Sequence, residues 1–438
     1  MTRLSPAERA RQAARTQPSA KLGKAVKPKA PRQARNKSAT LVSSNTTQQL
    51  RIIFDRAFRA QSVEFYRLLG VTLFLVAFGV VMVLSASSID SLVANSNSLW
   101  VFLKQFVFAI LGLLALSFVS LMSVDKIRAR ARGFFMVALI VQLLVFFIGK
   151  DINGNRNWID VFGLFSIQPS EFLKIAVILH VAAYLTSQQN YFEESRVWYR
   201  SLGMVGLAMF LVIIGKDLGT VIIMLITFIG LLTLAGLPSR ILLVVSGIMV
   251  ASMPILLTGS RLGRILAWMN PNGPDPLNYN WQAEHGMWAI SAGRIFGAGL
   301  GESKMKWSWI PEVENDFIFA VIAEELGLIG ALVVIALFVV LAFSLLRIMQ
   351  RTQDFFSRTV VAAIMLWLVF QALINIAVVL RLLPVLGVPL PLISAGGSSL
   401  ISALAAIGVV LAIERENHAT PQAVRAPSRS RSKAGARR

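Results

Sequence analysis

The chain has 438 residues, of which 55% are hydrophobic, and it contains many mostly apolar segments. These segments run to about 15 to 30 residues, long enough to cross a membrane as helices, so the composition excludes an ordinary soluble protein. The formal net charge of +21 would indicate nucleic-acid binding in a soluble protein, but much of this charge lies in two terminal tails. The sequence has no cysteine, which excludes disulfides and thiolate metal sites.

Both ends of the chain are basic and poor in aromatic residues. Residues 1–65 and 414–438 cannot bury enough apolar area to offset the entropy of ordering, which predicts two disordered tails. Next to a membrane, such tails are expected on the anionic cytoplasmic leaflet, with no nucleic-acid partner. The first apolar run begins near Tyr66, too late and too long for a cleavable signal peptide, so it should stay in the membrane.

Ten apolar segments predict an all-α polytopic membrane domain over residues 66–413. They lie near 66–87, 99–122, 133–149, 171–186, 202–215, 218–237, 240–258, 316–347, 359–380 and 397–413. Clusters of Lys and Arg at 126–132, 196–200 and 347–358 alternate with less basic loops, so the positive-inside rule puts both termini in the cytoplasm. The large loop 259–315, between the seventh and eighth helices, is then extracytoplasmic.

This large loop breaks the charge trend, although a loop of its size is translocated largely regardless of charge. Its cations are Arg261, Arg264, Arg294, Lys304 and Lys306. They could pair with acids of the same loop, Glu302, Glu312 and Glu314, or they could bind an anion. The pattern leaves both alternatives open.

The stretch "PEVENDFIFAVIAEELG" (311–327) places three acids at the start of, and inside, an apolar run. On spacing alone, Asp316 is a helix cap at the outer membrane boundary. Glu324 and Glu325 would lie roughly 12 to 14 Å deeper in a continuous helix, where a carboxylate needs a partner. At about 100° per residue, Glu324 could share a cavity with Asp316, whereas Glu325 should meet a cation or polar group on the other side.

Three further stretches carry polar residues into the membrane region. In "FSIQPSEFLK" (165–174), Glu171 and Lys174 share one helix face, either as an internal ion pair or with Lys174 free for a phosphate. "GKDLGT" (215–220) places Asp217 in a break that predicts a tight turn or a re-entrant elbow. "LPVLGVPLPLISAGGSSL" (383–400) predicts irregular backbone at membrane depth, lining a cavity.

No part of the sequence resembles a nucleotide-binding domain. No loop is long enough for an α/β domain of ~100 residues, and no P-loop or dinucleotide fingerprint follows a strand. Transferase chemistry would therefore use a donor that is already in the membrane. A lipid-linked diphosphate sugar would match the cations of the outer loop.

Four stretches together resemble the SEDS family (shape, elongation, division and sporulation) of ten-helix peptidoglycan glycosyltransferases. They are "NRNWIDVFGLFSIQPSEFLKIA" (155–176), "DLGT" (217–220), the long run from "NYNWQAEHGMW" to "EELGLIG" (278–330) and "LLPVLGVPLPLISAGGSSL" (382–400). The resemblance spans about residues 66–413. It departs from the family pattern in Asn315, where the family usually has Thr, and in Lys216, where it usually has Pro.

The resemblance implies a lipid II polymerase at the outer face of the cytoplasmic (inner) membrane, working with a cognate class B penicillin-binding protein transpeptidase. It implies that Asp316 is the catalytic residue, and general-base chemistry at the acceptor hydroxyl fits one carboxylate beside a diphosphate leaving group. No cofactor is certain; a divalent cation, Mg or Mn, or basic side chains could neutralise the leaving group.

The expected site residues follow from these stretches. The candidates for substrate binding are Arg156, Lys174, Arg261, Arg264, Gln282, Lys306, Ser394 and Ser398. The intramembrane polar or structural candidates are Glu171, Asp217, Glu324 and Glu325. No metal ligands are assigned.

Within the family, the long basic tails and "LPLISAGGSS" favour a division (FtsW-like) member over an elongation (RodA-like) member. A division member would work at the septum with other divisome proteins.

Two other functions stay open. A lipid II flippase would use the intramembrane charges along a transbilayer path. A scaffold without enzymatic activity would position the transpeptidase and recruit division proteins through the tails.

Overall fold

The computed structural model describes residues 61–419, except 153, 154, 162, 164, 257, 258, 276 and 308. The predicted tails fall mainly outside these residues. Where the described chain reaches them, it is helical: α3 begins at Val63, and α14 continues to Ala419. Glu414 and Arg415 are buried, and Arg415 donates to the carbonyl of Met122 at 3.0 Å. The C-terminal boundary predicted at 413 is therefore six residues too early.

Within the described residues, eight helices are long and apolar enough to cross a membrane. They are α3 (Val63–Asn95), α4 (Trp100–Ser120), α5 (Val124–Ile148), α6 (Pro169–Ser187), α7 (Ser195–Ile214), α12 (Ile318–Arg351), α13 (Phe355–Val379) and α14 (Gly397–Ala419). Two further apolar helices, α8 (Leu218–Leu234) and α9 (Ser239–Leu256), are shorter. The polytopic helical architecture predicted from hydropathy is confirmed.

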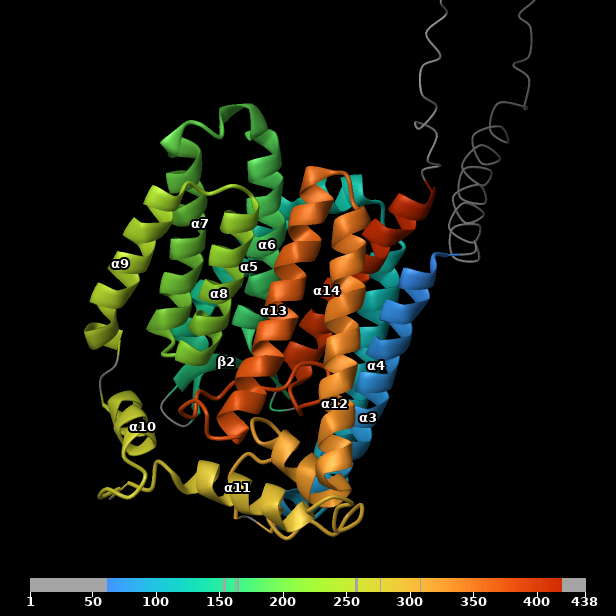
Figure 1. Cartoon of the computed structure of the whole chain (residues 1–438), viewed down its shortest axis with the longest axis vertical. Coiled ribbons are helices and arrows are strands. Elements are labelled where there is room, and N and C mark those ends of the chain that lie inside the picture. Colours follow the sequence, from blue (N-terminus) through green and yellow to red (C-terminus); the bar gives the residue numbers. More distant parts are fainter. Residues whose placement is uncertain are drawn as a thin grey trace, which may run out of the picture. The chain divides into compact units, whose positions relative to one another are not determined.

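The helices form two groups that meet at α6, α13 and α14. Figure 1 shows α5 to α9 on one side and α3, α4 and α12 on the other. The most buried helices are α6, α13 and α14, and they carry buried polar residues such as Glu171, Gln371 and Ser402. Polar side chains at membrane depth are costly unless they are packed inside the bundle. The interior of the bundle is therefore where a polar site can form.

A small antiparallel sheet connects α5 to α6, where the sequence pattern predicted no strand. Its strands are β1 (Lys150–Ile152), β2 (Asn155–Val161) and β3 (Phe165–Ile167), in the order β1-β2-β3. Ile159 pairs with Ile167, and Val161 pairs with Phe165. β1 and β3 have three residues each, too few for a period-two signal, and the apolar residues of the seven-residue β2 do not alternate with polar ones.

The large loop contains two helices, α10 (Ser260–Met269) and α11 (Trp281–Gly293). A single-turn 3-10 helix, Gln189–Tyr191, lies before α7. Figure 1 shows α10 and α11 beyond one end of the spanning helices, on the side where α12 begins. The loop therefore covers this end of the bundle.

Helix α12 is broken at Gly327, which has φ 68° and ψ −167°. The backbone on both sides of the break bonds to the preceding loop: Ala298 N–H donates to the Glu324 carbonyl, and Leu328 N–H donates to the Arg294 carbonyl, both at 2.9 Å. A continuous helix was assumed in placing Glu324 far below Asp316. The break instead separates a short helix, residues 318–326, from the long apolar helix that follows, and the end of the short helix is bonded to the loop.

The segment between α13 and α14 is irregular, as its prolines and glycines predict. It packs deep in the fold, where Leu390, Leu392 and Ile393 are buried. Gly79 on α3 permits this packing, because a Cβ there would lie 2.6 Å from the Ile393 backbone. The segment is thus held close to the loop that carries Asp316.

Candidate active site

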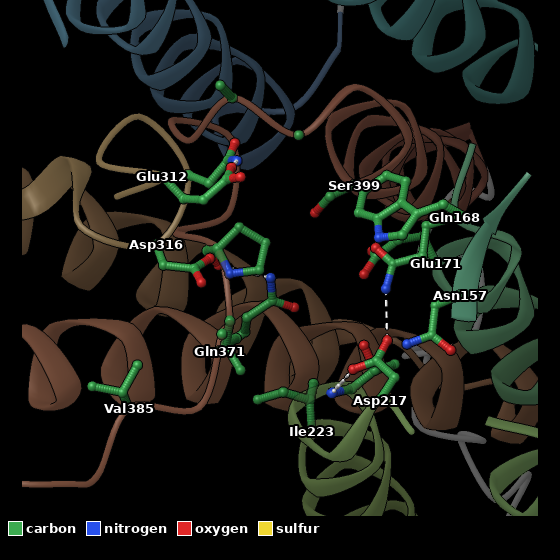
Figure 2. Close-up of a pocket in the computed structure, with 18 of the residues that line it drawn as sticks. Asn157, Gln168, Glu171, Asp217, Ile223, Glu312, Asp316, Gln371, Val385 and Ser399 are labelled. Carbon is green, nitrogen blue, oxygen red and sulfur yellow. Dashed lines mark hydrogen bonds between the residues drawn. The ribbon is translucent and has the colours of Figure 1, made fainter. Parts of the chain in front are cut away.

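A cavity of about 390 Å³ opens among the irregular segment, the sheet and the interior helices. Figure 2 shows Glu312 and Asp316 on one side of it, and Gln168, Glu171 and Asp217 on the other. Its polar lining is contributed by Asn157, Ser166, Gln168, Glu171, Lys174, Asp217, Thr220, Arg264, Gln282, Glu312, Asn315, Asp316, Gln371 and Ser399. Polar groups from at least six elements therefore converge on one space.

The backbone around Asp316 is fixed from both sides. Asn375 on α13 donates to the Asp316 carbonyl at 2.8 Å, and Ser394 Oγ donates to the Asn315 carbonyl at 2.5 Å. Ala395 N–H donates to the Glu314 carbonyl at 2.9 Å. These three bonds attach the loop before α12 to α13 and to the irregular segment, so the position of the Asp316 side chain is set by buried neighbours.

The Asp316 carboxylate is free to act on a ligand. Helix α12 starts at Ile318, and its N-terminus has no side-chain cap, so the capping interpretation of Asp316 is wrong. In the part of the chain that is described, this carboxylate has no hydrogen-bond donor and no ion-pair partner. Gly387 lies beside this carboxylate, where a Cβ would be in contact with Oδ2 at 3.4 Å.

Electrostatics raise the pKa of Asp316 from 3.8 to about 7. Burial is the largest cause, and Glu312 adds repulsion, while the Arg264 guanidinium opposes the rise. Burial also raises the pKa of the neighbouring Glu314 to about 7. A carboxyl group that titrates near neutral pH is suited to taking up and releasing a proton.

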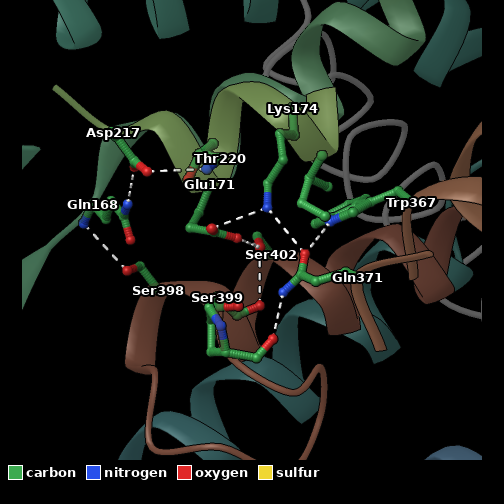
Figure 3. A network of polar contacts seen from close by, with 12 residues as sticks. Gln168, Glu171, Lys174, Asp217, Thr220, Trp367, Gln371, Ser398, Ser399 and Ser402 are labelled. Atoms are coloured by element: carbon green, nitrogen blue, oxygen red, sulfur yellow. Dashed lines mark hydrogen bonds and ion pairs between the residues drawn. The ribbon is translucent and has the colours of Figure 1, made fainter. Parts of the chain in front are cut away.

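The inner wall of the cavity is a closed polar network, shown in Figure 3. Lys174 Nζ lies 3.0 Å from Glu171 Oε1 and 3.3 Å from Gln371 Oε1, and it stacks over the Trp367 ring at 4.6 Å. Ser402 donates to the other Glu171 oxygen at 3.2 Å. The structure thus has the internal ion pair, the first of the two alternatives for Glu171 and Lys174.

Asp217 lies at the break between α7 and α8 and caps α8. Its carboxylate accepts from Thr220 N–H at 3.0 Å and from Gln168 Nε2 at 2.6 Å. Gln168 N–H in turn donates to Ser398 Oγ at 3.2 Å. The preceding Lys216 has φ 64°, which no proline can adopt, so the departure from the family pattern gives this turn a conformation of its own.

The predicted substrate-binding residues divide between the cavity and its surroundings. Lys174, Arg264 and Gln282 line it. Ser394 and Ser398 stand behind the wall, where they hold the loop and Gln168. Arg261 donates to the Lys216 carbonyl at 2.8 Å, and Arg156 donates to the Gly149 carbonyl at 2.8 Å, both outside the cavity lining.

The prediction that Glu324 shares a cavity with Asp316 is wrong. Glu324 accepts from Ser303 Oγ at 2.5 Å and from Lys304 N–H at 2.8 Å, and it does not line the Asp316 cavity. Glu325 accepts from Ser85 Oγ at 2.6 Å and lies 3.7 Å from Lys306 Nζ. Lys306 is therefore engaged in a buried ion pair and does not line the Asp316 cavity.

Sequence reasoning missed several residues at the site. Glu312 and Asn315 stand next to Asp316, but nothing in the loop sequence distinguishes them from ordinary polar surface residues. Asn375 and Gln371 lie inside a span that hydropathy treats as uniformly apolar. Their spacing of four residues, which places both on one face of α13, is the signal that could have identified them.

The chain is similar to curated proteins of cell-wall synthesis. It is 38% identical over 370 residues to the probable peptidoglycan glycosyltransferase FtsW of Mycobacterium tuberculosis, covering 83% of this chain and 70% of the relative. It is 36% identical over 352 residues to stage V sporulation protein E of Bacillus subtilis, covering 79% of this chain and 95% of the relative.

Solved structures have the same fold. One is a chain from a structure described as the structural coordination of polymerization and crosslinking by a peptidoglycan synthase complex. It matches with a TM-score of 0.66 and 26% identity, and the match covers 83% of this chain and 100% of the other. The rod shape determining protein RodA of Thermus thermophilus matches with a TM-score of 0.61, 26% identity, and coverage of 83% and 99%. The family model for the cell cycle proteins FtsW, RodA and SpoVE matches residues 66–419, so this chain belongs to that family.

Proposed function

We propose that this chain is a peptidoglycan glycosyltransferase that polymerises lipid II into glycan strands, with Asp316 as the general base. The observation that carries the proposal is an unpaired carboxylate of pKa about 7 in a polar cavity at the end of the bundle. The relatives named peptidoglycan glycosyltransferase support the reaction class. No nucleotide donor is required, because the lipid-linked sugar is its own activated donor.

In the reaction, the 4-hydroxyl oxygen of the acceptor sugar attacks the anomeric carbon of the donor sugar. The bond from that carbon to the diphosphate oxygen breaks, and the diphosphate leaves with the electron pair. The acceptor proton passes to Asp316, which then releases it to water. One carboxylate suffices, because the diphosphate leaving group needs its charge neutralised more than it needs a proton.

Neutralisation of the leaving group is assigned to Arg264, an exposed cation of α10 that lines the cavity. Among the described residues, no group of three or more His, Asp or Glu side chains could hold a metal ion. If a magnesium or manganese ion accompanies the diphosphate of the substrate, Glu312 would be its oxygen ligand in the cavity, which leaves Asp316 to accept the proton. The protein's own contribution is to orient the sugars and accept the proton.

The proposed topology has ten membrane helices, with α8 and α9 added to the eight long ones, and both termini in the cytoplasm. The basic ends of α5, α7 and α12 support this orientation, since they carry Lys126, Arg196 and Arg351. Loop 259–315 and the Asp316 cavity would then face outward from the cytoplasmic membrane. There, the sugar ends of lipid II are in water and the polyprenyl chains are in lipid.

We place the protein in septal wall synthesis, together with a class B penicillin-binding protein transpeptidase and other divisome proteins. The FtsW names among the relatives support division, and the peptidoglycan synthase complex among the similar structures supports a crosslinking partner. An elongation role, like that of RodA, is the alternative. Depletion of the chain from cells should block septation before it alters cell width, whereas an elongation enzyme would show the reverse.

The direct test is conversion of lipid II into glycan strands by the purified chain with its partner transpeptidase. Asp316→Ala should abolish the strands while the protein elutes as a folded monomer or complex, and chelation of divalent ions tests the metal separately. Rapid translocation of labelled lipid II in liposomes, unaffected by Asp316→Asn and without strand formation, would instead establish a transporter.

A further inference from the structure

A second hollow, which we call the α5–α7 groove, lies outside the candidate active site. It has a volume of about 510 Å³. Its apolar walls come from the last turns of α5 and α7, with Leu143, Phe146, Phe147, Leu211 and Ile214. Phe146 and Phe147 are 54% and 65% exposed, so in a membrane this groove is open to lipid chains. Hydrocarbon is the natural neighbour of such walls.

Two cations stand at the outer end of the groove, where the apolar walls stop. Arg156 lines the groove, and its guanidinium donates to the Gly149 carbonyl at 2.8 Å and to the Phe147 carbonyl at 3.4 Å. Lys216 also lines it and is exposed, and its side chain has no hydrogen bond or ion pair with another described residue. No acid among the described residues lines the groove, so its mouth is positive and suited to an anion.

A buried amide adds a polar point inside the groove. Gln142 is 3% exposed, and its Oε1 has no hydrogen-bond partner among the described residues. A buried polar atom without a partner costs about 1–3 kcal/mol. Turned end for end, the same amide would present its N–H₂ group to an oxygen of an occupant. Only the head group of an amphiphile could satisfy this amide, because a hydrocarbon chain has no hydrogen-bond acceptor.

The groove and the Asp316 cavity are separated by β2. Successive side chains of a strand point to opposite faces. Arg156 lines the groove, and the next residue, Asn157, lines the cavity. The strand lies tight against the end of α7, since Arg156 N–H donates to the Gly215 carbonyl at 3.1 Å and a Cβ on Gly215 would overlap Asn157.

We propose that the α5–α7 groove binds a polyprenyl diphosphate, the lipid carrier that the transfer reaction releases. This inference rests on the proposed function, which supplies the carrier. The single isoprenoid chain would lie along the aromatic walls, and the diphosphate would lie between Arg156 and Lys216. Two cations match the charge of a diphosphate, and the thin wall of β2 places the groove directly beside the space where the diphosphate departs.

The test is photo-crosslinking in detergent or nanodiscs, with benzoylphenylalanine in place of Phe146 and, as a position outside the groove, in place of Phe106 on α4. Radiolabelled undecaprenyl diphosphate is the probe. We expect crosslinking at position 146 at least fivefold above that at 106. Lys216→Gln and Arg156→Gln should each reduce the signal severalfold, whereas Lys304→Gln, at an exposed cation elsewhere on the outer loop, should not.

Competition identifies the occupant. Excess unlabelled undecaprenyl diphosphate should remove the crosslink, and phosphatidylglycerol at the same excess should not. Equal competition by phosphatidylglycerol, equal labelling at both positions, or no effect of Lys216→Gln would each overturn the proposal. The assay does not depend on turnover: it is repeated in the Asp316→Ala variant, so that loss of polymerase activity and loss of carrier binding are measured separately.

Discussion

Asn375 holds Asp316 in place: its Nδ2 donates at 2.8 Å to the Asp316 carbonyl and at 2.7 Å to the Val388 carbonyl. One side chain of a membrane helix thereby joins the loop that carries the carboxylate to the irregular segment beside it. The bond to the Val388 carbonyl is buried, and the bond to the Asp316 carbonyl is partly buried. Asn375 is thus a positioning residue for the site, although it does not touch the cavity.

Asn375→Ala should reduce polymerisation about tenfold or more, because it leaves the buried Val388 carbonyl without a donor, at about 1–3 kcal/mol, and releases the Asp316 backbone. The loss should appear mainly in kcat, since the substrate-binding groups are untouched. Initial rates over a range of lipid II concentrations would measure it. A variant with normal kcat and a raised KM would show that the amide does not position Asp316.

The pH dependence of the reaction reports the proton acceptor. A general base acts when it is deprotonated, so the rate should rise with pH up to about 7, the pKa of Asp316, and then level off. Arg264→Gln removes a cation that lowers this pKa and should move the rise to higher pH. Glu312→Gln removes a repelling acid and should move it to lower pH. The two variants are each other's control, and shifts in the same direction would contradict the assignment.

The Glu171 and Lys174 pair should behave as a buried ion pair. Lys174→Met leaves a carboxylate that is bonded only to Ser402, and the expected loss of stability is about 3–5 kcal/mol. The double variant Glu171→Gln/Lys174→Met removes both charges and should recover a large part of that loss. Thermal unfolding in detergent measures both. A double variant that loses about 3–5 kcal/mol of stability beyond the loss in Lys174→Met would show that the two side chains do not act as a pair.

Gly327 should not tolerate a side chain. Its φ of 68° disfavours any other residue, and a Cβ there would collide with the backbone of Gly297 and Ile295. Gly327→Ala should therefore displace the half-helix 318–326 that follows Asp316, and both stability and polymerisation should fall. Gly70→Ala, on an exposed helical turn with no atom within 4 Å, is the matched control and should be neutral or slightly stabilising. Normal activity of Gly327→Ala would mean that the break does not position the site.

The helices could be predicted because a membrane span leaves a hydropathy signal that needs no tertiary information. The position of Asp316 just before a long apolar helix also followed from the sequence. The partners of Glu324 could not be predicted, because Ser303 and Lys304 lie about 20 positions earlier, in a loop without a regular pattern. Asn375 and Ser394 hold the backbone of the Asp316 loop from positions about 60 and 80 residues later in the chain. Local sequence patterns do not predict contacts over such separations.

The measurement that tests the central claim most directly is strand formation from lipid II by Asp316→Asn, compared with Glu314→Gln, two residues away. Both substitutions keep the size of the side chain and remove one charge. We predict that Asp316→Asn forms no strands above background, whereas Glu314→Gln retains at least a third of the wild-type rate. Strand formation by Asp316→Asn at the rate of the wild type would show that this carboxylate is not the base.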